Sequence, residues 1–250
     1  SGDDVEAIID RSRRRLGMER LDLVQFHWWD YDVPGYVNAA LHLNRLRKAG
    51  KIKHIGVTNF DAAHLEEIVG AGVPIVSNQV QYSVLDRRPE GGMVDFCARH
   101  GIDLLCYGTV AGGFLTERYL GAPEPEHPLE NRSLTKYKLI IDDSGGWSLF
   151  QELLETLKGI AERHGASIAT VATRYVLQKP RVAGVIVGAR NTKHLDDTVQ
   201  LFDFALDEKD VAAIEAVQAR AEGPVGTVYG LERVKGGRHA SIMKYNLNRT

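Results

Sequence analysis

The feature that most constrains the fold is an alternation of short apolar runs with longer amphipathic stretches. The short runs are rich in β-branched residues, as strands are, and they occupy 21–26, 52–57, 74–80, 103–107 and 183–187. Helical spacing of apolar residues appears before the first run, over 4–15, and after each of the first three runs, over 36–48, 61–70 and 89–100. No hairpin signal joins consecutive runs. The order therefore predicts βαβ crossovers and a parallel sheet.

The fourth interval is much longer than the others. We expect an irregular loop over 111–147, followed by helices near 148–163 and 167–178, with Ser167 as the N-cap of the second. This order fits either a (β/α)₈ barrel or an open doubly wound sheet. Periodicity and composition do not separate the two architectures.

Two more helices are expected after the last strand, near 192–202 and 208–221, with Asp207 as the N-cap of the second. We expect residues 1–250 to form one domain, because no repeat, low-complexity tract or linker divides them.

Composition excludes several classes of function. The formal net charge of −2 leaves no basic excess for binding a nucleic acid backbone. No apolar run approaches the roughly 18 residues that cross a bilayer. Neither cysteine, Cys97 or Cys106, has metal-type spacing, so we expect no metal site and a cytoplasmic or other reducing intracellular location.

Polar or aromatic side chains lie at or just after the end of each of the five predicted strands, at His27, Thr58-Asn59, Gln79, Tyr107 and Arg190. In both candidate architectures ligands bind where strands give way to the following loops. One such residue could satisfy its hydrogen bonds within the core. Five consecutive strands that end this way favour a shared ligand.

The motifs at these strand ends resemble those of the aldo-keto reductases over about residues 4–215. The segments that carry the resemblance are Leu21–Trp28, Gly56-Val57-Thr58-Asn59-Phe60, Asn78-Gln79-Val80-Gln81-Tyr82, Cys106-Tyr107-Gly108 and Val185–Arg190. The resemblance implies a (β/α)₈ TIM barrel, with about five of its eight βα units in this chain. It also implies hydride transfer between NAD(P)H and a carbonyl or alcohol substrate.

The resemblance assigns a role to each strand end. His27 matches the histidine that donates a hydrogen bond to the substrate carbonyl; the alternative is a core histidine satisfied by backbone. Thr58, Asn59 and Gln79 match residues that bind the nicotinamide carboxamide. Tyr107 matches the tyrosine that stacks on the nicotinamide ring, although its ring also suits a core position.

Two further segments match the phosphate and adenosine ends of the cofactor. The first is a glycine-rich loop that leaves backbone N–H groups open to an anion, with Gly108, Thr109, Val110 and Gly112 as its candidate residues. The second opens a helix and contributes Gly188, Arg190, Asn191, His194, Asp197 and Thr198. Much of the family has Lys-Ser where this chain has Gly188-Ala189. The preference for NADP(H) over NAD(H) then depends mainly on Arg190.

Large aromatic side chains follow His27 in the sequence. Trp28, Trp29 and Tyr31 lie on the loop where substrate pockets are lined, which favours an apolar or aromatic carbonyl compound. The same side chains could instead pack under the 111–147 loop. The expected partner is a small carbonyl or alcohol molecule, and the sequence does not indicate an oligomeric state.

The family also uses an Asp, a Tyr and a Lys from units that precede the histidine strand, with the tyrosine as general acid. Only a helix precedes His27 here, so no residue matches those three by position. We therefore expect the chain to be part of a longer polypeptide or a truncated paralogue, weak or inactive by itself. The alternative function is a non-catalytic cofactor-binding or partner-binding protein derived from the same fold.

Overall fold

A computed structural model describes residues 2–189, 192 and 194–243. Five strands form one sheet in which every neighbouring pair is parallel and the spatial order follows the chain. The strands are β1 (Leu21–His27), β2 (Ile52–Thr58), β3 (Ile75–Gln81), β4 (Asp103–Tyr107) and β5 (Val182–Ile186). The predicted strands and their parallel order are confirmed.

Helices alternate with the strands as the amphipathic stretches predict. They are α1 (Gly2–Leu16), α2 (Tyr36–Lys48), α3 (Ala62–Gly70) and α4 (Met93–His100). The carboxylate of Asp61 accepts a hydrogen bond from the backbone N–H of His64 and so caps the start of α3. Gly101 adopts the left-handed conformation that ends α4. Local sequence therefore fixes the start of α3 and the end of α4.

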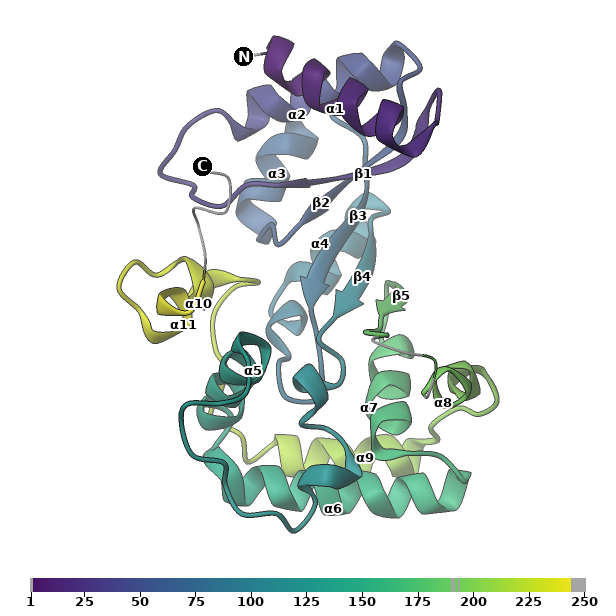
Figure 1. Ribbon diagram of the computed structural model, residues 1–250, viewed down its shortest axis with the longest axis vertical. Helices are drawn as coiled ribbons and strands as arrows, with labels where there is room; N and C mark the ends of the chain where they lie inside the picture. Colours follow the sequence, from purple (N-terminus) through teal and green to yellow (C-terminus); the bar gives the residue numbers. More distant parts are fainter. Residues whose placement is uncertain (1, 190–191, 193, 244–250) are drawn as a thin grey trace.

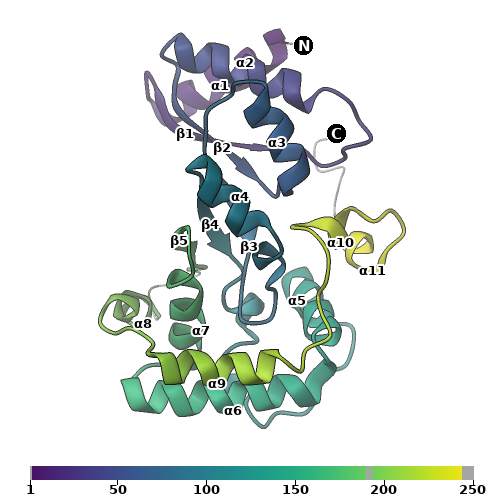
Figure 2. The same ribbon diagram turned by 180° about the vertical axis from the view of Figure 1, so that it is seen from behind.

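The later helices lie close to the predicted ranges: α6 (Gly146–His164), α7 (Ile168–Leu177), α8 (Leu195–Val199) and α9 (Glu208–Gln218). Both predicted N-caps are confirmed. Ser167 accepts a hydrogen bond from the Thr170 backbone, and Asp207 forms a reciprocal capping box with Asp210. α6 and α9 run side by side at one end of the molecule (Figures 1 and 2).

The prediction of an irregular loop over the whole of 111–147 is wrong. The first part holds only short 3₁₀ turns, but α5 (Arg132–Asp143) follows. Asn131 caps α5, and Leu134, Tyr137, Ile140 and Ile141 bury one face of it. Glycines and prolines are frequent upstream of Asn131, whereas the apolar spacing after it produces a helix.

Two short helices that the sequence reading did not predict complete the described chain, α10 (Gly230–Arg233) and α11 (Arg238–Ser241). They return the chain to α5, beside which they lie in Figures 1 and 2. Arg238 and His239 both bond to the carboxylate of Asp143 at the end of α5. We call residues 222–243 the C-terminal segment.

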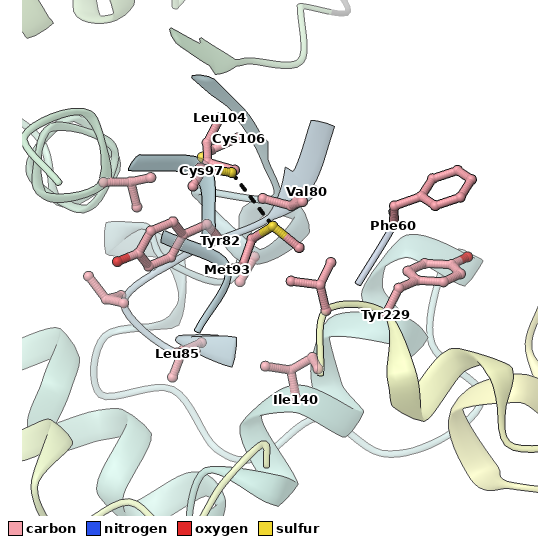
Figure 3. Packing of buried hydrophobic residues seen from close by; sticks show 14 of the residues in the cluster. Phe60, Val80, Tyr82, Leu85, Met93, Cys97, Leu104, Cys106, Ile140 and Tyr229 are labelled. Atoms are coloured by element: carbon pink, nitrogen blue, oxygen red, sulfur yellow. Dashed lines mark hydrogen bonds between the residues drawn. The ribbon is translucent and has the colours of Figure 1, made fainter. Parts of the chain in front are cut away.

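A continuous core connects the sheet to the helices around it. Buried apolar side chains of β1 to β4, of α2 to α7, and of Tyr229 in the C-terminal segment belong to one cluster, against which Val182 and Val185 of β5 pack. Figure 3 shows part of it, where the thiol of Cys97 contacts the sulfur of Met93 at 3.6 Å. Burial raises the pKa of each thiol, Cys97 and Cys106, to about 12, so both are protonated core residues.

In the described part of the chain, no helix combines the length and the apolar character that crossing a membrane requires. The same residues contain no group of three or more His, Cys, Asp or Glu side chains that could hold a metal ion.

Candidate active site

The register of the sheet places three predicted residues in one row. His27 pairs with Thr58 across β1 and β2, and Thr58 pairs with Gln79 across β2 and β3. Register partners in a parallel sheet lie on the same face, about 4.8 Å apart. A row that spans three strands at their carboxyl ends can therefore contact one small ligand.

Asn59 and Tyr107 are joined directly. The hydroxyl of Tyr107 donates a 2.9 Å hydrogen bond to Oδ1 of Asn59. Asn59 is buried and has a left-handed backbone with φ of 60°, which asparagine tolerates better than most residues. Among the described residues, its side-chain N–H₂ group makes no hydrogen bond. That group remains able to donate to a ligand.

The imidazole of His27 is held without a hydrogen bond on one nitrogen. Within the described chain, its Nε2 atom is buried and has no partner. The ring lies 4.8 Å from the Trp29 ring and 6.0 Å from the Tyr229 ring, between centroids. Burial, and then the charge of Arg233, lower the pKa of His27 to about 4. His27 is therefore neutral near pH 7 and can hydrogen-bond a carbonyl or hydroxyl group without adding charge.

The three aromatic residues after His27 differ in their surroundings. Of these three, Trp29 is the one whose ring contacts the His27 ring. The indole N–H of Trp28 bonds to carbonyls of its own loop, at Asp30 and Val33. The ring of Tyr31 stacks on His64 of α3, with 3.5 Å between centroids. Trp29 is thus the residue of the predicted substrate pocket that lies beside His27.

A cleft of about 650 Å³ lies beyond the carboxyl ends of β4 and β5. Both predicted phosphate segments line it, although about eighty residues separate them in the chain. The predicted residues in its wall are Tyr107, Gly108, Thr109, Val110, Gly112, Gly188, His194 and Thr198. Its volume falls within the range of small-molecule and cofactor sites.

Some predicted residues lie apart from this cleft. Thr58, Asn59, Gln79 and Asp197 are not among the described residues that line it. Asp197 instead approaches His194, with 3.3 Å between Oδ2 and Nδ1. Arg190 and Asn191 lie outside the described residues.

The cleft also contains polar residues that the sequence reading did not single out. Arg118 stacks its guanidinium on Tyr119 at 5.3 Å, and both line the cleft with Glu130, Asn131 and Ser133. They belong to the stretch that was expected to be irregular throughout. They reach the cleft because α5 packs beside the glycine loop, which no local sequence pattern indicates.

Glycine is required at two positions of the loop after β4. Gly108 and Gly112 have φ of 77° and 66°, a conformation that side chains rarely adopt. A Cβ atom at either position would also overlap the Tyr137 ring or its hydroxyl. Tyr137 of α5 therefore packs directly on the glycine loop and forms one wall of the cleft.

Lys136 lies beside the site although no sequence motif predicts it there. Its Nζ atom lies 5.1 Å from the ring centroid of Tyr107, 5.5 Å from Tyr137 and 5.8 Å from Tyr229. Burial lowers the pKa of Lys136, against the attraction of two buried carboxylates, Glu232 and Asp86. No sequence motif marks it, because the three rings come from three separate segments.

The C-terminal segment is fastened to the strand ends by Arg233. Its guanidinium donates to the backbone carbonyls of Trp28, Trp29 and Asn59, at 2.9 to 3.1 Å. It also lies 4.1 Å from the centre of the Tyr31 ring. One side chain thus holds the loop after His27 and the turn after β2 in fixed relation.

A buried ion cluster also holds the C-terminal segment in place, through Glu232. Arg88 donates to both oxygens of Asp86 and to both oxygens of Glu232, at 2.7 to 3.0 Å. Gln81 adds a bond to Asp86 at 2.6 Å. All three charged side chains are almost fully buried. A buried charge of this kind is tolerated because each carboxylate is hydrogen-bonded.

These features define a parallel α/β protein with a cleft at the carboxyl ends of β4 and β5. The model of the aldo/keto reductase family matches residues 1–219. The chain belongs to that family.

Three similar proteins illustrate the match. Flagellar radial spoke protein 5 of Chlamydomonas reinhardtii is 34% identical over 201 residues, which are 68% of this chain and 38% of that protein. L-glyceraldehyde 3-phosphate reductase of Escherichia coli is 26% identical over 84% of this chain and 61% of its own length. A solved aldo-keto reductase from Bacillus halodurans superposes with a TM-score of 0.70 at 25% identity, over 93% of this chain and 72% of that one.

The chain therefore spans less than two-thirds of the length of the two curated relatives. Its parallel sheet and helices match those of aldo-keto reductase barrels, which confirms the predicted fold class.

Proposed function

We propose that this chain provides the cofactor-binding and substrate-orienting part of a nicotinamide-dependent reductase of small carbonyl compounds. One observation carries the proposal. Residues 107–113 line a single cleft together with residues 186–189 and 194–198, which come much later in the chain. Tyr107 ends β4, which is the neighbour in the sheet of β3, the strand that carries Gln79 of the row of His27, Thr58 and Gln79. If each residue served only the packing of the core, the two segments would have no reason to line the same cleft.

The residues present fit a nicotinamide dinucleotide. The loop from Gly108 to Gly113 suits a pyrophosphate, because its glycines allow an anion to approach the main chain. The N–H groups of Ala111 and Gly113 bond within the loop, to Gly108 and Val110, so the other N–H groups are the candidates for the anion. The ring of Tyr107 suits a nicotinamide, and the side-chain N–H₂ of Asn59 suits its carboxamide oxygen. When bound, the cofactor supplies or accepts a hydride.

His27 orients the substrate in this proposal. Its neutral ring and buried, unpartnered Nε2 atom allow one hydrogen bond to a carbonyl oxygen. Trp29 and Tyr229 flank the ring and exclude water from it. A dry, fixed hydrogen-bonding group of this kind holds a carbonyl in one orientation.

We further propose that NADP(H) is preferred over NAD(H). Arg118 adds a cation to the wall of the cleft, and a guanidinium suits a 2′-phosphate. Arg118→Gln is expected to weaken NADPH binding more than NADH binding. Equal losses for both cofactors would remove Arg118 from this role.

A second candidate has a specific observation in its favour. A relative that is 34% identical is a flagellar radial spoke protein. We therefore keep, as the alternative, a cofactor-binding protein of this fold that acts through binding partners rather than through turnover.

Titration with NADPH and NADH, followed by tryptophan fluorescence, tests the proposal. Trp28 and Trp29 follow β1 near the site, so we expect quenching, with the tighter binding for NADPH. Absence of binding by either cofactor at millimolar concentration contradicts both candidates. The polypeptide as naturally encoded separates them, because the reductase oxidises NADPH with aldehydes whereas the alternative only binds it.

A further inference from the structure

The ammonium group of Lys136 is enclosed by aromatic rings at the edge of the site. Tyr107, Tyr137 and Tyr229 each place a ring centroid within 6 Å of Nζ. Attraction between a cation and the faces of aromatic rings stabilises the ammonium in this position. The three tyrosines come from β4, α5 and the C-terminal segment, so the position depends on the assembled fold.

Lys136 has hydrogen-bonding capacity that the protein does not use. An ammonium group carries three N–H donors. Lys136 nevertheless makes no hydrogen bond and no ion pair in the described chain. Lys138, on the same helix, pairs with both Glu124 and Asp142. Donors held beside a site without an acceptor are available to a ligand.

The nearby buried carboxylates balance the charge of Lys136 without accepting its hydrogen bonds. The cluster of Arg88, Asp86 and Glu232 carries one net negative charge. Its carboxylate oxygens already accept hydrogen bonds from Arg88, and Asp86 also accepts one from Gln81. The negative charge of the cluster therefore stabilises the buried ammonium group of Lys136. The N–H groups of Lys136 remain available to a ligand.

The position of Lys136 indicates which ligand uses these groups. Lys136 is not among the described residues that line the glycine-loop cleft, although its neighbour Tyr137 is. It lies 5.8 Å from the ring of Tyr229, and the His27 ring lies 6.0 Å from that same ring. The His27 ring and the ammonium of Lys136 are therefore no more than about 12 Å apart, a separation within the length of a small metabolite.

We propose that Lys136 binds an oxyanion, a carboxylate or a phosphate, carried by the substrate whose carbonyl lies at His27. This rests on the proposed function. It makes Lys136 a specificity-determining residue, selecting carbonyl compounds that bear an acidic group at the far end. Charge-assisted hydrogen bonds of an ammonium to an oxyanion are about twice as strong as neutral ones.

Binding of matched charged and neutral probes by calorimetry tests the proposal. The carboxylate pair is 4-carboxybenzaldehyde and methyl 4-formylbenzoate, and the phosphate pair is glyceraldehyde 3-phosphate and glyceraldehyde. Each probe is titrated with and without saturating NADP⁺. The wild type is expected to favour at least one charged probe over its neutral partner by about 10-fold or more.

Lys136→Met is expected to abolish that preference, and Lys136→Arg to keep most of it. Lys136→Gln serves if the methionine variant does not fold. Lys158→Met, on α6 where Lys158 pairs with Glu162, is the control and should leave the preference unchanged. NADP⁺ affinity should be the same in all variants.

Three results overturn the proposal: equal affinities within both probe pairs in the wild type, a preference that survives in Lys136→Met, or a loss of NADP⁺ binding instead of probe selectivity. The last result would place Lys136 at the cofactor phosphates. Failure of the proposed function looks different. In that case no cofactor binds to the wild type, while the cofactor-free titrations still report whether Lys136 selects an anion.

Discussion

The hydroxyl of Tyr107 and the side-chain carbonyl of Asn59 form a 2.9 Å hydrogen bond that connects the ends of two strands that are not neighbours. Asn59 follows β2 and Tyr107 ends β4, and β3 lies between them in the sheet. The bond fixes the ring and the amide relative to each other across β3. Two residues proposed to hold the nicotinamide are therefore positioned by one contact.

Tyr107→Phe should weaken both folding and cofactor binding. It leaves the buried carbonyl oxygen of Asn59 without its donor, which costs about 1 to 3 kcal/mol of unfolding free energy. Cofactor affinity should fall severalfold because Asn59 loses its fixed orientation. Urea unfolding and fluorescence titration measure the two effects. Tyr175→Phe, which removes a buried hydrogen bond to Gln218 away from the cleft, is the control and should leave cofactor affinity unchanged. Equal stability of Tyr107→Phe and wild type would show that the bond contributes nothing.

Gly108→Ala should destabilise the protein more than Gly113→Ala. Both glycines have positive φ, so both substitutions carry a conformational cost of about 1 to 2 kcal/mol. Only at Gly108 would the new Cβ overlap Tyr137, whereas no atom lies within 4 Å of it at Gly113. The difference in unfolding free energy isolates the contact with α5. Matching losses would mean that α5 moves away at no cost.

His27 should stay neutral in the folded protein well below the pH at which a free histidine is protonated. Burial and the charge of Arg233 lower its pKa from 6.5 to about 4. Between these two values the unfolded chain binds the proton more readily, so the unfolding free energy falls as the pH decreases through this range. Histidine NMR titration measures the pKa of His27 directly.

His27→Asn should remove the decrease in unfolding free energy between pH 6.5 and about 4 that is assigned to His27. Urea unfolding at several pH values between about 7 and 4 compares the slopes of variant and wild type. Parallel curves would contradict the assignment of the proton uptake to His27.

Glu232→Gln should be strongly destabilising. It leaves Arg88 short of a charged partner in the buried cluster, and breaking such a pair costs about 3 to 5 kcal/mol. Burial opposes ionisation of Glu232, but hydrogen bonds and attraction from Arg88 outweigh it and hold its pKa below 4.5.

The stabilisation from Glu232 is therefore complete above about pH 4.5 and is lost as the pH falls through the lowered pKa. The difference in unfolding free energy between wild type and Glu232→Gln should therefore become smaller at acidic pH, as measured by chemical unfolding. Glu215→Gln, which removes an exposed partner of Lys179, is the control and should change stability by less than about 1 kcal/mol. A gap that stays constant with pH would exclude Glu232 as the titrating group.

Much of the fold was predictable because its signals are local. The β-branched runs predicted the five strands of the sheet. Ser167 and Asp207 were predictable as N-caps because a capping side chain bonds to the backbone N–H only three residues further on. α5 was missed because glycines and prolines before Asn131 dominate that stretch. Its helical face is evident only from Leu134, Tyr137 and Ile140 taken together.

The sequence by itself determined the alternation of strands and helices and the polar residues at each strand end, since spacing along the chain specifies both. Only the tertiary structure decided that Tyr107 bonds Asn59, that Tyr137 packs on Gly108, and that three tyrosines enclose Lys136. Each of these contacts joins segments that are brought together by burial of apolar surface in a common core. Burial of that kind depends on the total area removed from water and leaves no local pattern around a residue such as Lys136.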